Sequence, residues 1–182
     1  MDSVAGAQQP QQPAAGARLN LGCGEDYRTG QAWHNVDIRS AVGPDQVVDL
    51  RERPWPWPDD HFSGAVADNV IEHLPVYESL AELARVLEPG SVAEIAGPHW
   101  HSTGAWNDPT HTRPLMPESL TYYELGDAWE LRSVEWECVR WGRVLPDSLA
   151  VWLADMVGQG VTGWRANARV TVSGDPLAQG AD

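Results

Sequence analysis

A glycine-rich turn between two apolar segments is the feature that most constrains the fold. Residues 18–24 read Arg-Leu-Asn-Leu-Gly-Cys-Gly, and a second apolar segment, residues 35–38, contains Asp37. Because Gly22 and Gly24 carry no Cβ, their backbone can adopt a positive φ and lie against a ligand. The Asp37 carboxylate can accept hydrogen bonds from both hydroxyls of a ribose. The turn lacks the third glycine of the dinucleotide fingerprint, and the acid follows Gly24 by only thirteen residues, so a pyrophosphate cradle is disfavoured.

The rest of the chain alternates between expected strands and helices. Apolar runs and alternating patterns predict strands at residues 18–22, 33–38, 46–50, 64–69, 91–96, 130–140 and 165–172. A helix is expected at residues 76–88. Such alternation implies an α/β fold with a parallel sheet covered by helices. We expect one domain at residues 18–174, a disordered tail at residues 1–17 and a flexible carboxyl terminus at residues 175–182.

Five further segments, taken in chain order with the glycine turn, resemble the class I S-adenosylmethionine-dependent methyltransferases, in particular the small stand-alone members. These segments are Val47–Leu50, Pro54–Phe62, Ala65–Leu74, Leu83–Gly90 and Val92–Pro98. The resemblance implies a Rossmann-like three-layer sandwich. Its mostly parallel seven-stranded sheet is expected to end in an antiparallel C-terminal strand, with a helix at residues 149–156 between the sixth and seventh strands.

The resemblance also implies S-adenosyl-L-methionine as the cofactor and places it at the ends of the first four strands. The cofactor-binding candidates are Leu21, Gly22, Cys23, Gly24, Asp37, Ile38, Asp49, Leu50, Asp68 and Asn69. The two glycines are expected under the methionine portion, Asp37 on the ribose, and Asp49 with Leu50 at the adenine. Asp68 and Asn69 are expected to face the sulfonium end. Ligand-free alternatives remain open: a tight turn, a solvated strand end at Asp37, and helix or turn caps at the other polar residues.

Residues 97–113 are the segment richest in chemical groups, with three of the six histidines, two tryptophans and an acid. The segment follows the fifth strand, so we expect it to form one wall of the acceptor pocket. Its run 108–113 is similar to a D-P-x-H-x-R loop of some small methyltransferases. An oxygen or nitrogen acceptor must lose a proton, and histidine titrates near neutral pH. The candidate catalytic residues are His111, Asp108, His99 and His101.

Two other interpretations of this segment stay open. The same four side chains offer imidazole and carboxylate ligands for a divalent ion, although H-x-H alone is a weak signal. Alternatively, they hydrogen-bond the loop to itself while the tryptophans cap the core. The pair Glu72-His73, at the expected helix start after the fourth strand, is interpreted as structural.

The charge of the chain limits its partners. The formal net charge is −14, and all twelve basic residues are arginine. Such a surface repels nucleic acid and anionic membranes at ordinary ionic strength. The run Asp68-Asn-Val-Ile71 also differs from the Asp/Asn-Pro-Pro-Tyr run of DNA base methylases. We therefore expect a small-molecule, glycan or other non-nucleic-acid acceptor. In molar salt the Debye length shortens to about 3 Å and this repulsion weakens. The acidic, lysine-free composition is typical of a salt-loving source, although a G+C-rich genome also replaces lysine with arginine.

No segment has the pattern of a secretory signal or the apolar length of a membrane span. The two cysteines, Cys23 and Cys138, match no disulfide framework or zinc pattern. A cytoplasmic S-adenosylmethionine-dependent methyltransferase with a small or medium-sized acceptor is the function that the sequence favours. The alternatives are a catalytically silent S-adenosylmethionine-binding module and a metal-dependent enzyme that uses the histidine-rich loop 99–111.

Overall fold

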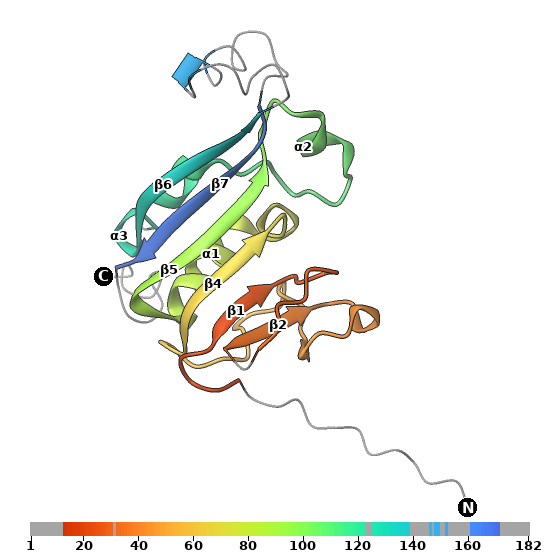
Figure 1. The fold of residues 1–182 in the computed structure, drawn as a ribbon, viewed down its shortest axis with the longest axis vertical. Helices are drawn as coiled ribbons and strands as arrows, with labels where there is room; N and C mark the ends of the chain where they lie inside the picture. Colours follow the sequence, from red (N-terminus) through yellow and green to blue (C-terminus); the bar gives the residue numbers. More distant parts are fainter. Residues whose placement is uncertain are drawn as a thin grey trace, which may run out of the picture.

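The computed structural model describes residues 13–30, 32–122, 125–138, 146, 148–149, 152 and 161–171. A seven-stranded sheet forms the centre of this part of the chain, with the strand order β3-β2-β1-β4-β5-β7-β6 (Figure 1). The strands are β1 (Arg18–Leu21), β2 (Trp33–Asp37), β3 (Gln46–Val47), β4 (Phe62–Asp68), β5 (Leu87–Pro98), β6 (Trp129–Cys138) and β7 (Val161–Val170).

The order of the strands determines where a ligand can bind. Strands β1 to β5 run parallel, whereas β7 is antiparallel to both β5 and β6. The chain passes outward from β1 to β2 and β3, then returns to place β4 on the other side of β1. This reversal is the topological switch point, beyond which open α/β sheets bind their ligands. The predicted seven-stranded, mostly parallel sheet with an antiparallel C-terminal strand is confirmed.

Short helices connect the strands. They are α1 (Val76–Val86), α2 (Thr103–Asn107), α3 (Leu125–Ala128) and the 3₁₀ segments η1 (Ser40–Val42), η2 (Ile71–His73) and η3 (Pro117–Thr121). The helix α1 has Glu78 in its first turn and Arg85 in its last turn, as the helix dipole favours. It gives way to β5 just before Pro89, which cannot continue a helix. No helix in the described ranges has the length and apolar character needed to cross a membrane.

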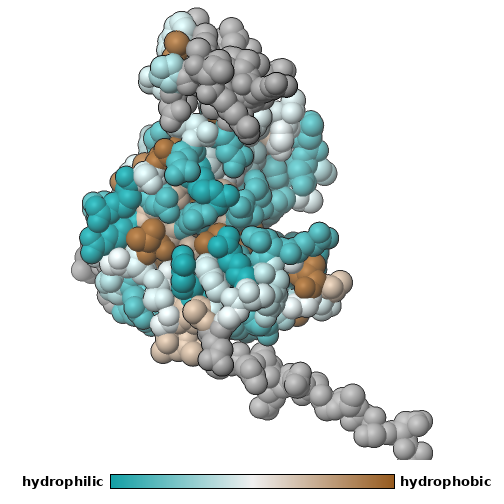
Figure 2. Space-filling view, in the orientation of Figure 1, coloured by the Kyte–Doolittle hydropathy of each residue, from teal (hydrophilic) through white to brown (hydrophobic). Residues whose placement is uncertain are grey.

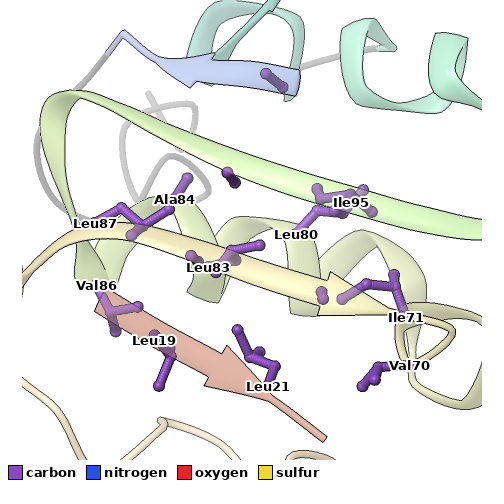
Figure 3. Close-up of a cluster of buried hydrophobic side chains, with 14 of the residues drawn as sticks. Leu19, Leu21, Val70, Ile71, Leu80, Leu83, Ala84, Val86, Leu87 and Ile95 are labelled. Carbon is purple, nitrogen blue, oxygen red and sulfur yellow. The ribbon is translucent and has the colours of Figure 1, made fainter. Parts of the chain in front are cut away.

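The core lies between one face of the sheet and α1. Leu19 and Leu21 of β1, Ile95 of β5, and Leu80 and Leu83 of α1 are each at most 1% exposed. Figure 3 shows these side chains pointing into the space between the strands and the helix. Each such leucine or isoleucine contributes about 1.5–3 kcal/mol when fully buried. The core therefore holds the carboxyl ends of β1 and β4 at a fixed position.

The opposite face of the sheet is polar. Arg165 of β7 pairs there with Asp68 of β4 at 2.8 Å and with Glu94 of β5. Figure 2 shows this face as largely hydrophilic, while α1 and α3 lie behind the sheet (Figure 1). Of the two helical layers expected for a three-layer sandwich, the described residues supply the one that contains α1, η3 and α3.

Several element boundaries differ from the expected ones. Strand β3 ends at Val47 because the chain turns at Asp49, and β5 begins at Leu87, directly after α1. Part of the expected tail is ordered: the Gly16 N–H donates to the His61 carbonyl at 2.9 Å, and Ala17 is buried. Most of the expected helix 149–156, the carboxyl terminus 175–182 and residues 1–12 lie outside the described residues.

Candidate functional site

A cavity of about 580 Å³ lies at the carboxyl edge of β1, β2 and β4. Its lining residues are Gly22, Asp37, Ile38, Arg39, Val48, Asp49, Leu50, Arg51, Asn69, Val70, His73, Leu74 and Thr110. The molecule is hollowed at this edge in the space-filling view (Figure 2). Six of the ten cofactor-binding candidates line the cavity, namely Gly22, Asp37, Ile38, Asp49, Leu50 and Asn69.

The glycine turn forms the floor of this cavity. Gly22 has a φ of +54° and Gly24 a φ of +51°, as the sequence predicts. A Cβ on Gly22 would lie 2.5 Å from the Cγ2 atom of Val70, which follows β4. Any side chain at Gly22 would therefore be strained in its backbone and would collide with a buried neighbour. Glycine at this position therefore lets the turn pack against Val70, which also lines the cavity.

Asp37 joins the end of β2 to the glycine turn. Its Oδ2 atom accepts the Gly24 N–H at 2.8 Å, and its Oδ1 atom accepts the Arg39 N–H at 2.8 Å. Burial alone raises the pKa of Asp37, but the hydrogen bonds from Arg39 and Gly24 outweigh burial and lower it. The carboxylate is therefore ionised at neutral pH. The Oδ1 atom also accepts the Nε–H of Arg39 at 3.2 Å, so Oδ2 is the oxygen that keeps a lone pair for a further hydrogen bond.

Asp49, which follows β3, accepts hydrogen bonds from Arg51 in the same way as Asp37 accepts them from Arg39. Its Oδ1 accepts both the N–H and the Nε–H of Arg51, at 3.0 and 2.8 Å, and its Oδ2 accepts from the Arg51 NH2 at 2.6 Å. The hydrogen bonds from Arg51 lower the pKa of Asp49. The triplets Asp37-Ile-Arg39 and Asp49-Leu-Arg51 thus each present one acid, one apolar residue and one arginine to the cavity.

Of the two polar residues at the end of β4, Asn69 lines the cavity and Asp68 does not. Asn69 lines the cavity with a φ of +53°, and its Nδ2 donates to the Asp68 Oδ1 at 2.7 Å. Asp68 itself is not among the lining residues, because its Oδ2 pairs with Arg165 at 2.8 Å across the polar face. Asp68 therefore lies behind the lining and contacts Asn69, and its contact with the cofactor stays a prediction.

Three other cofactor candidates also lie behind the lining. Leu21 is 1% exposed and belongs to the core, and Cys23 is buried with its N–H donating to the Val36 carbonyl at 2.9 Å. Gly24 does not line the cavity, but its N–H donates to the Asp37 carboxylate, which does. The sequence analysis did not predict Arg39 and Arg51, which also line the cavity. The repeated Asp-x-Arg triplet is the sequence pattern that could have indicated them.

The other end of the cavity carries a hydrogen-bonded relay. The Thr110 hydroxyl lies 2.6 Å from the Asp108 Oδ1, which also accepts the Thr110 N–H at 2.8 Å. The same hydroxyl lies 2.8 Å from the Nδ1 atom of His73. Asp108 thus orients the imidazole of His73, and the connection runs through the Thr110 hydroxyl. His73 and Thr110 both line the cavity.

Two further side chains meet His73. The His111 ring lies with its centroid 4.6 Å from that of His73, and its Nδ1 atom is 3.0 Å from the Ala105 carbonyl oxygen. Glu72 is 1% exposed, and neither carboxylate oxygen has a hydrogen-bond partner among the described residues. One ligand atom each from Glu72, His73 and His111 lies within 4.8 Å of the others. Burial raises the pKa of Glu72, and burial with the neighbouring His111 lowers the pKa of His73.

The remaining histidines of the loop lie elsewhere. The His99 side chain is fully buried, and its Nδ1 accepts the His101 N–H at 3.3 Å. Its ring centroid lies 5.8 Å from that of Trp136 on β6. Neither His99 nor His101 lines the cavity or belongs to the group around Glu72. Of the predicted catalytic residues, the structure therefore brings only Asp108 and His111 close to the cavity.

Comparison with known proteins rests on structure. No family model matches the chain, and none of the curated proteins compared with it matches by sequence. A SAM-dependent methyltransferase from Archaeoglobus fulgidus is similar with a TM-score of 0.60 and 19% identity over 86% of this chain and 87% of that chain. One from Mesorhizobium loti is similar with a TM-score of 0.58 and 15% identity over 88% and 94% of the two chains.

A solved structure with a different activity in its name has the same degree of similarity. The 4+2 cyclase SpnF matches with a TM-score of 0.58 and 18% identity over 87% of this chain and 77% of that chain. At such identities the likeness concerns the fold. The chain therefore has the Rossmann-like α/β fold of the class I S-adenosylmethionine-dependent methyltransferases.

Proposed function

We propose that the protein is an S-adenosylmethionine-dependent methyltransferase that binds its cofactor in the cavity beyond β1, β2 and β4. The observation that carries this proposal is the arrangement around the switch point. An open glycine turn, an ionised buried acid at the end of β2 and a second acid after β3 border one cavity of about 580 Å³. The fold shared with solved methyltransferases supports it.

The residues present fit this cofactor. The cavity volume is in the range of small-molecule sites, which is about 300–1,000 Å³. Gly22 lines the cavity without a side chain and packs against Val70, a second lining residue, so the methionine portion can lie along its backbone. The Asp37 Oδ2, which accepts only the Gly24 N–H among the described residues, keeps a lone pair for a ribose hydroxyl. Ile38 and Leu50 offer apolar surface for the adenine beside Asp49.

When bound, S-adenosylmethionine supplies an electrophilic methyl group on a positively charged sulfonium. The protein has to hold the acceptor in line with that group and exclude water. Asn69 borders the cavity from β4, and His73 and Thr110 border it from the far side. We infer that the acceptor enters beside His73 and Thr110. The roles of His111, Asp108, His99 and His101 in acid-base chemistry remain predictions.

The acceptor is proposed to be a small or medium-sized molecule, a glycan or another non-nucleic-acid compound. The net charge of −14 supports this choice, because no excess of cationic side chains is present to displace counterions from a polyanion.

Calorimetry with S-adenosylmethionine and S-adenosylhomocysteine tests the cofactor claim. We expect one site with micromolar or tighter affinity in the salt concentration that the protein prefers. Absence of both heat and thermal shift across a series of salt concentrations would contradict the proposal.

A second experiment separates an enzyme from other proteins with this fold. A solved structure named as a 4+2 cyclase shares this fold, so the fold alone does not imply methyl transfer. The second candidate is a protein that binds the cofactor without transferring its methyl group. Methyl-labelled cofactor is incubated with cell extract fractionated into small molecules, glycans, proteins and nucleic acids. We expect label in the small-molecule or glycan fraction. Intact binding without label in any fraction would favour the second candidate.

A further inference from the structure

The hydrogen bonds around His111 determine which of its nitrogens has a free lone pair. The Ala105 carbonyl oxygen, 3.0 Å from Nδ1, can only accept a hydrogen bond. The proton of the neutral ring must therefore lie on Nδ1. It follows that Nε2 carries a lone pair that can bind an ion.

The relay from Asp108 has the same effect on His73. An ionised carboxylate only accepts, so the Thr110 hydroxyl donates its proton to Asp108 over 2.6 Å. The Thr110 oxygen must then accept from the Nδ1–H of His73 at 2.8 Å. His73 is therefore also held in the tautomer with a lone pair on Nε2. Two facing imidazoles, each anchored through Nδ1 to an oxygen, match the way proteins orient histidine ligands of metals.

Glu72 completes the group. Its carboxylate is 1% exposed, and neither oxygen has a hydrogen-bond partner in the described part of the chain. A buried carboxylate without a partner is costly. The backbone around it is nevertheless fixed, because the Thr112 N–H donates to the Glu72 carbonyl at 2.7 Å and the Thr112 hydroxyl donates to the Leu74 carbonyl at 2.7 Å. This pair of bonds joins the loop that carries His111 to the segment that carries Glu72 and His73.

We propose that Glu72, His73 and His111 bind a divalent transition-metal ion of the zinc type. Their ligand atoms lie within 4.8 Å of one another, so an ion at their centre comes within bonding distance after small side-chain movements. Two imidazoles and one carboxylate are the donor set of mononuclear zinc and iron sites. Magnesium and calcium prefer sets made of oxygen atoms.

The position of this site gives the ion access to the proposed acceptor. His73 lines the cavity, and three protein ligands leave coordination positions open for an oxygen or nitrogen of a bound molecule. An ion there lowers the pKa of a coordinated hydroxyl or water. The Nε2 lone pair of His111 is then bound to the ion, so His111 acts as a metal ligand and not as a general base. The site goes beyond the proposed methyl transfer and is tested without the cofactor.

Metal binding is measured on the full-length, untagged protein after treatment with chelator. Addition of Co²⁺ should give a saturable visible absorption band, which one equivalent of Zn²⁺ should abolish. Elemental analysis should then find about one zinc per chain. The competition titration should give a micromolar or tighter affinity. Zn²⁺ should also raise the melting temperature of the metal-free protein.

Variants assign the ligands. We expect Glu72→Gln and His111→Ala to weaken Zn²⁺ binding by about 100-fold or more. Thr110→Val, which removes the hydroxyl that orients His73, should weaken it by about 10- to 100-fold. The matched control is His101→Ala, a histidine of the same loop outside the group, which should bind as the wild type does.

The proposal is overturned if Co²⁺ gives no saturable band, or if Glu72→Gln binds Zn²⁺ like the wild type. Equal losses in His101→Ala and His111→Ala would place the ion elsewhere in the loop and also overturn it. Circular dichroism checks that each variant is folded. Should Glu72→Gln not fold, the thermal shift by Zn²⁺ decides: it must be present in the wild type and in His101→Ala, and absent in His111→Ala.

Discussion

The carboxylate of Asp37 accepts the backbone N–H of Gly24 at 2.8 Å, across thirteen positions of the chain. This hydrogen bond ties the end of β2 to the turn that follows β1. The same carboxylate lines the cavity, so one side chain both shapes the glycine turn and presents a lone pair to a ligand.

Replacing Asp37 should therefore weaken cofactor binding strongly. For Asp37→Ala we expect a loss of about 1.5–3 kcal/mol, or about 10- to 150-fold in Kd, the scale of hydrogen bonds to a charged acceptor. The control is Asp26→Ala, because Asp26 is an exposed acid in the same loop that does not line the cavity. Calorimetry on both variants gives the comparison. Equal affinities of Asp37→Ala and the wild type would show that Asp37 only terminates the strand.

The cost of a side chain at Gly22 has a steric part and a backbone part that can be separated. Gly43 also has a positive φ, +67°, but a Cβ there meets nothing within 4 Å. Gly43→Ala should destabilise the protein by about 1–2 kcal/mol through the backbone alone. Gly22→Ala adds the collision with Val70 and should cost about 1–3 kcal/mol more. Urea denaturation measures both variants, and equal costs would contradict the close approach of Val70.

A buried ion pair attaches α1 to the loop before β4. Arg85 donates to both carboxylate oxygens of Glu82, at 2.9 and 2.8 Å, and to the carbonyl oxygens of Trp55 and Trp57. Glu82→Gln removes the buried charge partner and leaves Arg85 paired with Asp59, a more exposed carboxylate at 2.8 Å, so it should destabilise the protein by about 1–3 kcal/mol. Glu78→Gln, on the same helix, breaks only an exposed pair with Arg53 at 3.7 Å and should cost less than about 1 kcal/mol. Urea denaturation compares the two variants.

The same ion pair predicts a pH dependence. Burial raises the pKa of Glu82, but the hydrogen bonds from Arg85 and the Trp55 N–H outweigh burial and lower it below the usual value. A lowered pKa in the folded state stabilises the protein above the unfolded value, about 4.3, and this stabilisation is lost as the pH falls through the folded pKa. The difference in free energy of unfolding between wild type and Glu82→Gln should therefore shrink below about pH 4. A difference that stays constant down to pH 3 would contradict the assignment.

Salt should stabilise the protein by screening its negative charge. With a net charge of −14, carboxylates repel one another in the folded state, and raising NaCl from about 0.1 to 1 M shortens the Debye length from about 10 to 3 Å. We expect the melting temperature at pH 7 to rise by several degrees. The control is the same series near the sequence pI of 4.6, where the rise should be smaller. A melting temperature that falls with NaCl at pH 7 would refute the charge argument.

The sequence by itself predicted the seven strands and α1, but not α2, α3 or the 3₁₀ segments. Each prediction used residues that are close along the chain: the apolar runs of β1 and β2, the glycines between them, and the periodic face of α1. Such patterns depend on the backbone and on burial of one face, so they are readable without a tertiary structure. Gly22, which directly follows β1, and Asp37, which ends β2, were predictable for the same reason, whereas Asp49 was predicted through the family resemblance.

Only the tertiary structure decided which polar groups meet. The sequence grouped His111 with His99 and His101 because they are neighbours in the chain, whereas the fold separates them and brings His111 to Glu72 and His73. The contact between His73 and Thr110 spans 37 positions. Whether Glu72 is buried, and whether Asp68 faces a ligand or Arg165, depends on how distant loops and strands pack. Hydrogen bonds over such separations depend on the path of the whole chain, which local periodicity does not encode.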